Sequence, residues 1–147
     1  MNKWDKRFLD LAEHVSTWSK DPSTKVGAVI AHGKRLVSVG FNGFPPDIED
    51  TEERLNNREL KYKLIVHGEV NAISFANEDI TGFTLYTWPF MPCSKCAEKI
   101  VKKGIKRVVA PVMPEYLKGR WKDDMELAAE MFKEANITLD LVEDSSK

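Results

Sequence analysis

The sequence predicts an α/β domain with three layers, α/β/α, in which helices cover both faces of a five-stranded mixed sheet. Three observations lead to this fold class. Helical and strand patterns alternate after an opening pair of β-type segments, which implies a mixed sheet covered by helices. The 147 residues contain no repeat, low-complexity segment or linker, so we expect a single domain over residues 1–147. The apolar fraction of 42% and the charged fraction of 31% are those of an ordinary folded protein.

The first half of the chain predicts a helix, a hairpin and a polar insert. Residues 4–18 carry apolar side chains at helical spacing, and Asp21-Pro22 should stop this helix. Two short apolar runs at 26–31 and 36–41 predict a β-hairpin. Residues 43–63 have mixed charges and little apolar periodicity. This insert is either a solvated loop with a short helix or a segment that contacts a ligand.

The second half of the chain alternates regularly between helix and strand. We expect helices at 67–77, 93–103 and 123–135, and strands at 83–88, 106–112 and 137–142.

Charge and hydropathy limit the possible partners and location. The formal net charge of −1 argues against a general polyanion-binding surface, although a small basic pocket is compatible with it. The N-terminus mixes charged and apolar residues, unlike a signal peptide, and no segment is apolar over the length of a membrane span. We therefore expect a cytoplasmic protein that uses neither a membrane nor a nucleic acid as its partner.

Two cysteines and one histidine form a candidate metal site. Cys93 and Cys96 lie in a P-C-x-x-C stretch at a predicted helix start, where backbone N–H groups favour the thiolate. His67 lies at another helix start, two positions before Glu69. One imidazole and two thiolates would leave tetrahedral zinc one position for water, as in a catalytic site. Taken singly, the cysteines could form a redox pair, His67 could be a structural histidine and Glu69 a solvated carboxylate. Their combination matches the H-x-E…P-C-x-x-C signature of zinc deaminases.

Over nearly its full length, the chain resembles the deoxycytidylate deaminase family of the cytidine deaminase-like superfamily. Four segments carry this resemblance in the same order: S-K-D-P-S-T-K-V-G-A at 19–28, G-F-N-G-F-P at 40–45, H-G-E-V-N-A-I at 67–73 and G-I-K-R-V-V at 104–109. Gly68 stands where the family usually has alanine.

The resemblance implies zinc-dependent hydrolysis of dCMP to dUMP and ammonia. By this resemblance, His67, Cys93 and Cys96 hold the Zn²⁺ and Glu69 is the catalytic proton shuttle. Family members with a second, structural zinc use additional Cys and His residues before the H-x-E motif. Residues 43–66 contain neither, so we expect one zinc per chain.

The same resemblance implies that Asn42 reads a sugar hydroxyl. From their donor groups, Lys20, Thr24 and Lys25 are candidates to bind a 5′-phosphate, and Tyr116, in a proline-flanked stretch after the fourth predicted strand, is a candidate to cover the pocket. The alternatives are a simple turn residue at Asn42 and a solvated loop around Lys20.

The resemblance also implies regulation and assembly. Deoxycytidylate deaminases are commonly controlled by dCTP with Mg²⁺ and by dTTP, and this chain is expected to bind such an effector through its G-F-N-G-F stretch and the cations of its insert, which include Lys61. The expected effector residues are Gly40, Phe41, Gly43, Phe44, Arg54 and Arg58. In the alternatives, these cations belong to a solvated helix, or the triphosphate is itself a substrate. A homo-oligomer, specifically a hexamer, is expected, and Trp88, Phe90 and Trp121 would be aromatic surface for it.

Three other functions fit parts of the pattern. The chain could deaminate dCTP as well as dCMP. It could be a tRNA adenosine deaminase, but its weak acidity and its lack of a basic C-terminal helix argue against that. A non-catalytic binding module stabilised by zinc would have no use for Glu69.

Overall fold

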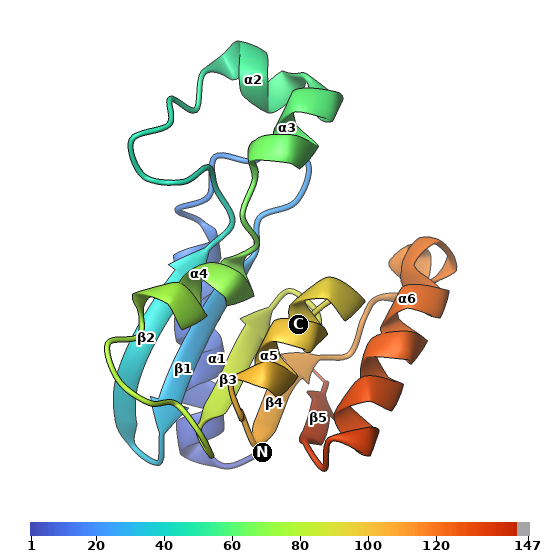
Figure 1. The fold of residues 1–147 in the computed structure, drawn as a ribbon. Helices are drawn as coiled ribbons and strands as arrows, with labels where there is room; N and C mark the ends of the chain where they lie inside the picture. Colours follow the sequence, from blue (N-terminus) through green and yellow to red (C-terminus); the bar gives the residue numbers. More distant parts are fainter. Residues whose placement is uncertain (144–147) are drawn as a thin grey trace.

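The computed structural model describes residues 1–143, with the exception of the side chains at positions 116–118 and 120. Its elements, in chain order (Figure 1), are α1 (Lys3–Ser16), β1 (Gly27–His32), β2 (Arg35–Phe41), α2 (Glu52–Asn56), α3 (Arg58–Leu64), α4 (Gly68–Phe75), β3 (Thr84–Trp88), α5 (Ser94–Lys102), β4 (Arg107–Pro111), α6 (Glu115–Glu134) and β5 (Thr138–Val142).

The five strands form the predicted mixed sheet, in the order β2-β1-β3-β4-β5. Strand β1 pairs antiparallel with β2 in the predicted hairpin and antiparallel with β3 on its other side. Strands β3, β4 and β5 run parallel to one another. The crossover helices between these parallel strands bring the starts of α5 and of α6 to the same end of the sheet.

Helices cover both faces of this sheet, which confirms the expected layers. Helix α1 lies behind the sheet in Figure 1, and α4, α5 and α6 lie in front of it. Strand β1 is buried on both sides, because Ala28 and Ile30 pack among residues of the α4–α6 layer whereas Val29 and Ala31 pack against α1. This alternation follows from the two-residue period of a strand.

The polar insert between β2 and α4 contains two short helices instead of one. Thr51 and Asn57 each accept a hydrogen bond from the backbone three residues later, and these N-caps start α2 and α3 in a sequence with little apolar periodicity. Figure 1 shows both helices projecting beyond the end of the sheet.

Two helix boundaries differ from the expectation. Helix α6 begins at Glu115 instead of at residue 123, directly after Pro114, a residue that suits the start of a helix. Tyr116 therefore lies in α6, not in a loop, and its side chain lies outside the described part of the structure. Helix α1 ends at Ser16, before the Asp21-Pro22 stop signal.

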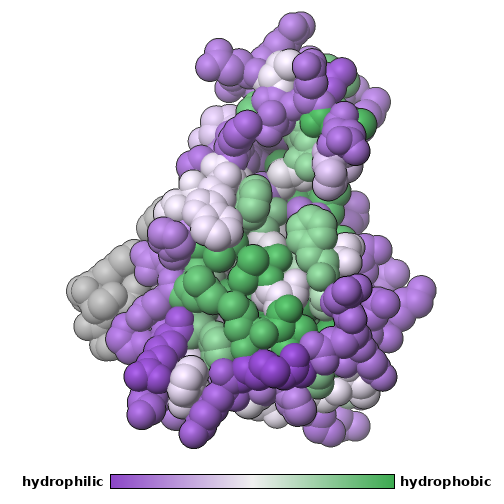
Figure 2. Space-filling view, turned by 90° about the vertical axis from the view of Figure 1, so that its left-hand side faces the viewer, coloured by the Kyte–Doolittle hydropathy of each residue, from purple (hydrophilic) through white to green (hydrophobic). Residues whose placement is uncertain are grey.

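The edge strand β2 carries exposed apolar surface. Figure 2 shows apolar residues gathered on the face that this edge presents, framed by hydrophilic residues. Leu36 on β2, Trp18 beside the end of β2 and Phe75 on α4 are each about half exposed. None of the helices in the described part of the chain combines the length and the hydropathy that a bilayer crossing needs.

Candidate active site

Two helix starts bring the candidate metal ligands together. His67 is the N-cap residue of α4 and Cys93 is the N-cap residue of α5, and neither side chain caps its own helix. Both side chains are therefore available to a shared centre. Cys96, one turn into α5, is almost completely buried and joins them.

The three ligand atoms have the spacing that zinc requires. The Nδ1 atom of His67 lies 3.2 Å from Cys96 Sγ and 3.5 Å from Cys93 Sγ, and all three ligand atoms lie within 4.8 Å of one another. Tetrahedral zinc, with Zn–N of about 2.0 Å and Zn–S of about 2.3 Å, holds its N and S ligands about 3.5 Å apart. His67, Cys93 and Cys96 are thus close enough together to share one zinc ion. Among the described residues, this is the one cluster of three or more such side chains.

The two thiols differ in their tendency to ionise. Hydrogen bonds from Cys96 and His67 lower the pKa of Cys93 to about 4. The hydrogen bond to Cys93, together with burial, raises the pKa of Cys96. One thiolate is therefore already favoured before a metal binds, and a cation at the centre would favour the second.

Glu69 is a buried carboxyl group beside this cluster. Glu69 is only 5% exposed, and burial raises the pKa of its carboxyl group above its usual range. A carboxyl group in this environment can hold a proton and release it to a neighbouring group, as an acid–base catalyst must.

A cavity of about 360 Å³ opens beside the cluster. Its volume is in the range of roughly 300–1,000 Å³ that small-molecule sites have. His67, Glu69 and Cys93 line one part of it, and side chains of the insert line another. Phe90 and Trp121, two of the aromatic residues expected on an oligomer surface, are half-buried and line this cavity as well, together with Met91. Trp88 is also half-buried.

Asn42 lies on the cavity, but its amide group is already engaged. Its Oδ1 accepts a hydrogen bond from the Val26 backbone at 2.8 Å, and its Nδ2 donates to the Thr24 carbonyl at 2.8 Å and to Asp21 at 3.4 Å. These contacts bind the end of β2 to the loop between α1 and β1. In the structure, Asn42 therefore holds the wall of the cavity in place.

Of the three residues that were expected to bind a phosphate, the structure places only one on the cavity. Thr24 lines the cavity. Lys20 forms an exposed ion pair with Asp50 at 3.2 Å, and Lys25 donates its ammonium hydrogen to the Ser19 carbonyl. Neither lysine is among the residues that line the cavity.

The expected effector residues do not gather into one separate pocket. Gly40 is packed against α4, where a Cβ atom would lie 2.3 Å from the Ala72 nitrogen. Gly43 is paired with Val66 through two backbone hydrogen bonds. Arg54 donates to the Glu49 carbonyl at 3.0 Å, whereas Arg58 lines the same cavity as Glu69.

Phe41 and Phe44, the aromatic residues among the expected effector residues, lie at the end of β2 and just after it. The Phe41 carbonyl accepts a hydrogen bond from Asn71 of α4 at 2.8 Å, and its ring packs edge-on against Trp18. Phe44 is half-buried. These contacts describe a packed junction between β2, α1 and α4.

Three supporting residues were not predicted in the roles that the structure gives them. Lys61 and Asp21 form a buried ion pair at 3.1 Å on the cavity wall. Asp124 of α6 accepts hydrogen bonds from the Ser94 backbone at 3.0 Å and from its hydroxyl group at 2.6 Å, and so caps the start of α5 beside Cys93. No sequence signal reveals these contacts, because the partners lie 30 or more positions apart.

Comparisons with known proteins agree on one family. The family model for the cytidine and deoxycytidylate deaminase zinc-binding region matches residues 2–112. A protein of Aliivibrio fischeri named "uncharacterized deaminase in luxG 3′ region" is 44% identical, over 93% of this chain and 92% of its own length. Human deoxycytidylate deaminase is 32% identical, over 92% of this chain and 78% of its own.

Solved structures have the same fold. The dCMP deaminase of the cyanophage S-TIM5 superimposes with a TM-score of 0.74 at 20% identity, over 97% of this chain and all of the phage protein. The same phage enzyme in complex with dCMP and dUMP gives a TM-score of 0.73 at 21% identity, over 97% of this chain and 99% of the phage protein. The five-stranded α/β fold is thus a cytidine deaminase-like fold.

Proposed function

This chain belongs to the cytidine and deoxycytidylate deaminase family, and on that premise we propose that it hydrolyses dCMP to dUMP and ammonia. The observation that carries the proposal is the placement of His67, Cys93 and Glu69 on one cavity, with Cys96 completing a set of three ligands. Three protein ligands leave tetrahedral zinc one open position, which suits catalysis and not a structural metal.

Each residue of the site has a distinct chemical task in this proposal. His67, Cys93 and Cys96 would hold Zn²⁺, which when bound supplies an activated water as the nucleophile. Glu69 would take a proton from the attacking water and pass it to ring N3, and would then take the remaining proton of the added hydroxyl group and pass it to the leaving amine. Its buried position shields these transfers from bulk water.

The number of metal ions is a direct test of the site. We propose one zinc per chain, because the described residues contain one suitable cluster. Elemental analysis of the purified protein should give about one zinc per chain. A chelator should remove activity, and Zn²⁺ should restore it. Two tightly bound zinc ions would contradict the proposal.

The substrate is tested by measuring ammonia release from dCMP, dCTP, CMP and deoxycytidine under identical conditions. We expect dCMP to have the highest kcat/KM. Turnover of dCTP at a similar rate would mean that the site accepts the triphosphate as a substrate. If none of the four compounds releases ammonia, the proposed function is wrong.

Control by dCTP with Mg²⁺ and by dTTP is a further proposal, which rests on the family resemblance alone. Coupling between two sites would appear as a shift of the dCMP saturation curve that exceeds competition at the zinc site. The expected measurement is therefore dCMP saturation with and without each triphosphate. Simple competition alone would exclude a separate effector site.

We also propose a cytoplasmic homo-oligomer, with a hexamer as the assembly that the resemblance implies. The exposed apolar residues beside β2 support an interface between copies. Reduced thiols at Cys93 and Cys96 are needed for metal binding and persist in a reducing compartment.

A further inference from the structure

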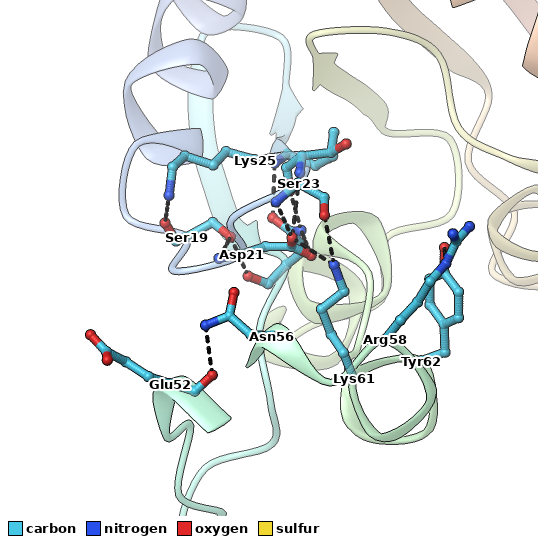
Figure 3. A network of polar contacts seen from close by, with 12 residues as sticks. Ser19, Asp21, Ser23, Lys25, Glu52, Asn56, Arg58, Lys61 and Tyr62 are labelled. Atoms are coloured by element: carbon cyan, nitrogen blue, oxygen red, sulfur yellow. Dashed lines mark hydrogen bonds and ion pairs between the residues drawn. The ribbon is translucent and has the colours of Figure 1, made fainter. Parts of the chain in front are cut away.

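Lys61 is a lysine that the fold has almost completely removed from water. Lys61 lies on α3 of the insert and is only 6% exposed. Its Nζ donates to Asp21 Oδ1 at 3.1 Å and to Ser23 Oγ at 3.0 Å (Figure 3). An ammonium group has three N–H donors, and the contacts within the described residues use two of them.

Asp21 is the fixed partner that holds this lysine in place. Besides Lys61, its carboxylate accepts hydrogen bonds from the backbone of Ser23 at 2.8 Å and of Thr24 at 3.4 Å, and from the Asn42 amide. The insert is therefore attached to the loop between α1 and β1 through a buried ion pair. Such a pair is costly to leave half made, so both side chains are firmly positioned.

The wall of the same cavity carries a second cation. Arg58, one turn before Lys61 on α3, lines the cavity, and its Nε donates to the Tyr62 hydroxyl at 3.3 Å. Its guanidinium lies 5.5 Å from the centre of the Tyr62 ring. The terminal nitrogens, which no described residue engages, keep their donors for a ligand. The Ser23 hydroxyl also lines this wall.

We infer that Lys61, Arg58 and Ser23 form the subsite that selects a phosphorylated substrate, with Asp21 as its positioning residue. This inference rests on the proposed function and names the group that separates a nucleotide from a nucleoside. The cations of the insert would then serve the substrate of the zinc site and not a separate effector.

The charge balance favours a monophosphate as the occupant. Of the residues in the inferred subsite, Lys61 and Arg58 are cationic, and Asp21, the partner of Lys61, is anionic, so these three leave one positive charge in excess. His67, Glu69 and Cys93, the groups of the metal site, line the same cavity. A phosphate monoester carries about −1.5 to −2 charges near pH 7 and offers three acceptor oxygens. Arginine and lysine donors suit those oxygens.

The test compares dCMP with deoxycytidine in the zinc-loaded enzyme. Lys61→Met should lower kcat/KM for dCMP about tenfold or more, mainly through KM, because hydrogen bonds to charged groups are the stronger kind. Turnover of deoxycytidine should fall much less than that of dCMP, since deoxycytidine lacks the phosphate. Arg58→Gln should also lower the ratio of kcat/KM for dCMP to kcat/KM for deoxycytidine. Lys61→Arg should recover part of the ratio that Lys61→Met loses.

A matched control and a binding measurement complete the design. Lys63→Met removes an exposed lysine from the same helix and should leave both substrates unchanged. Calorimetric titration with inorganic phosphate should show weaker binding to Lys61→Met and Arg58→Gln than to wild type. This readout does not need turnover, so it separates failure of the subsite from failure of the proposed function.

The inference is overturned if Lys61→Met and Arg58→Gln both keep the wild-type phosphate affinity and the wild-type ratio of the kcat/KM values for dCMP and deoxycytidine. Equal loss of dCMP and deoxycytidine turnover in Arg58→Gln, at an exposed position and with unchanged zinc content and urea unfolding, would also overturn it.

Discussion

Glu69 is the residue whose chemistry depends most on its surroundings. In the sequence it is one acidic residue among many, but burial in α4 raises the pKa of its carboxyl group. It stands two positions after a metal-ligand candidate and lines the cavity. Position and environment together make it the candidate acid–base group.

We expect Glu69→Gln to retain zinc and fold but to lose activity by about 10²- to 10⁴-fold, because the amide keeps the shape and cannot carry a proton. Zinc analysis and steady-state turnover measure the two properties separately. Glu98→Gln, an exposed position on α5, is the control and should keep full activity. Near-normal turnover of Glu69→Gln would show that another group moves the protons.

Gly68 illustrates a residue choice that the structure explains. A Cβ atom at this position would lie 3.2 Å from the Val26 carbonyl oxygen and 3.4 Å from the Asn42 nitrogen. The start of α4 thus lies close to the residues that flank β1 and β2, and a methyl group at position 68 would need them to shift by a few tenths of an ångström.

At the scale of elements, the position of α4 is set by its close approach to β2. Ser38 of β2 donates its hydroxyl hydrogen to the Ala72 carbonyl at 2.7 Å. Gly40 permits direct backbone contact, since a Cβ atom there would meet the Ala72 nitrogen at 2.3 Å and the Gly68 carbonyl oxygen at 2.6 Å.

Gly40→Ala should therefore push α4 from the sheet and lower the free energy of unfolding by about 2 kcal/mol or more, with loss of activity because α4 carries Glu69. Urea unfolding measures the change. Gly119→Ala is the control and should change the free energy of unfolding in the opposite direction. No described atom lies within 4 Å of the added methyl group, so the higher helix propensity of alanine should raise the free energy of unfolding by about 1 kcal/mol. A neutral effect of Gly40→Ala would mean that the contact between α4 and β2 is looser.

Helix α1 is attached to the sheet by a buried carboxylate. Asp5 accepts two hydrogen bonds from the Arg107 guanidinium at 2.8 Å and one from the Tyr86 hydroxyl at 2.8 Å. The hydrogen bond from Arg107 lowers the pKa of Asp5. Arg107 also donates to Asp140 at 2.7 Å, so the network connects α1, β3, β4 and β5.

This network predicts a pH dependence of stability. Because the folded pKa of Asp5 lies below the unfolded value, its contribution is present above about pH 4 and is lost as pH falls through the folded pKa. Urea unfolding of Asp5→Asn should show a weaker loss of stability on acidification than wild type. Asp10→Asn, at an exposed position of the same helix, should leave the acid limb unchanged. Equal acid sensitivity of Asp5→Asn and wild type would contradict this assignment.

At the scale of the whole molecule, one exposed apolar surface lies at the β2 edge of the sheet. The sequence suggested Trp88, Phe90 and Trp121 as the oligomer surface, but the structure half-buries all three. The exposed apolar side chains Trp18, Leu36 and Phe75 lie on or beside the edge strand instead. An open edge with such residues favours pairing with another chain.

We therefore expect light scattering to give a mass of several chains at micromolar concentration. Leu36→Arg should reduce that mass, because it places a charge in the apolar surface, and should keep the zinc content. Lys34→Arg, which keeps the positive charge at a nearby exposed position, is the control. A monomeric wild-type protein would exclude the interface.

The sequence by itself determined the fold class and the candidate zinc set. Strand and helix periods are local properties, and five strands with four of the helices follow from them, as do the positions of His67 and of the Cys93–Cys96 pair at helix starts. The second helix of the insert was missed because an N-cap at Asn57, and not apolar periodicity, defines its start. The early start of α6 was missed because its first turns lack the apolar spacing that was used to place the helix.

Only the tertiary structure decided which charges face the cavity. Lys20, Lys25, Arg54, Arg58 and Lys61 are equivalent in the sequence as cations of polar segments. Folding pairs Lys61 with Asp21 across 40 positions and places Arg58 on the cavity wall, while Lys20 pairs with Asp50 at the surface. Asp5 likewise meets Arg107 across 102 positions. Contacts of this kind depend on how distant segments pack, and no local pattern encodes them.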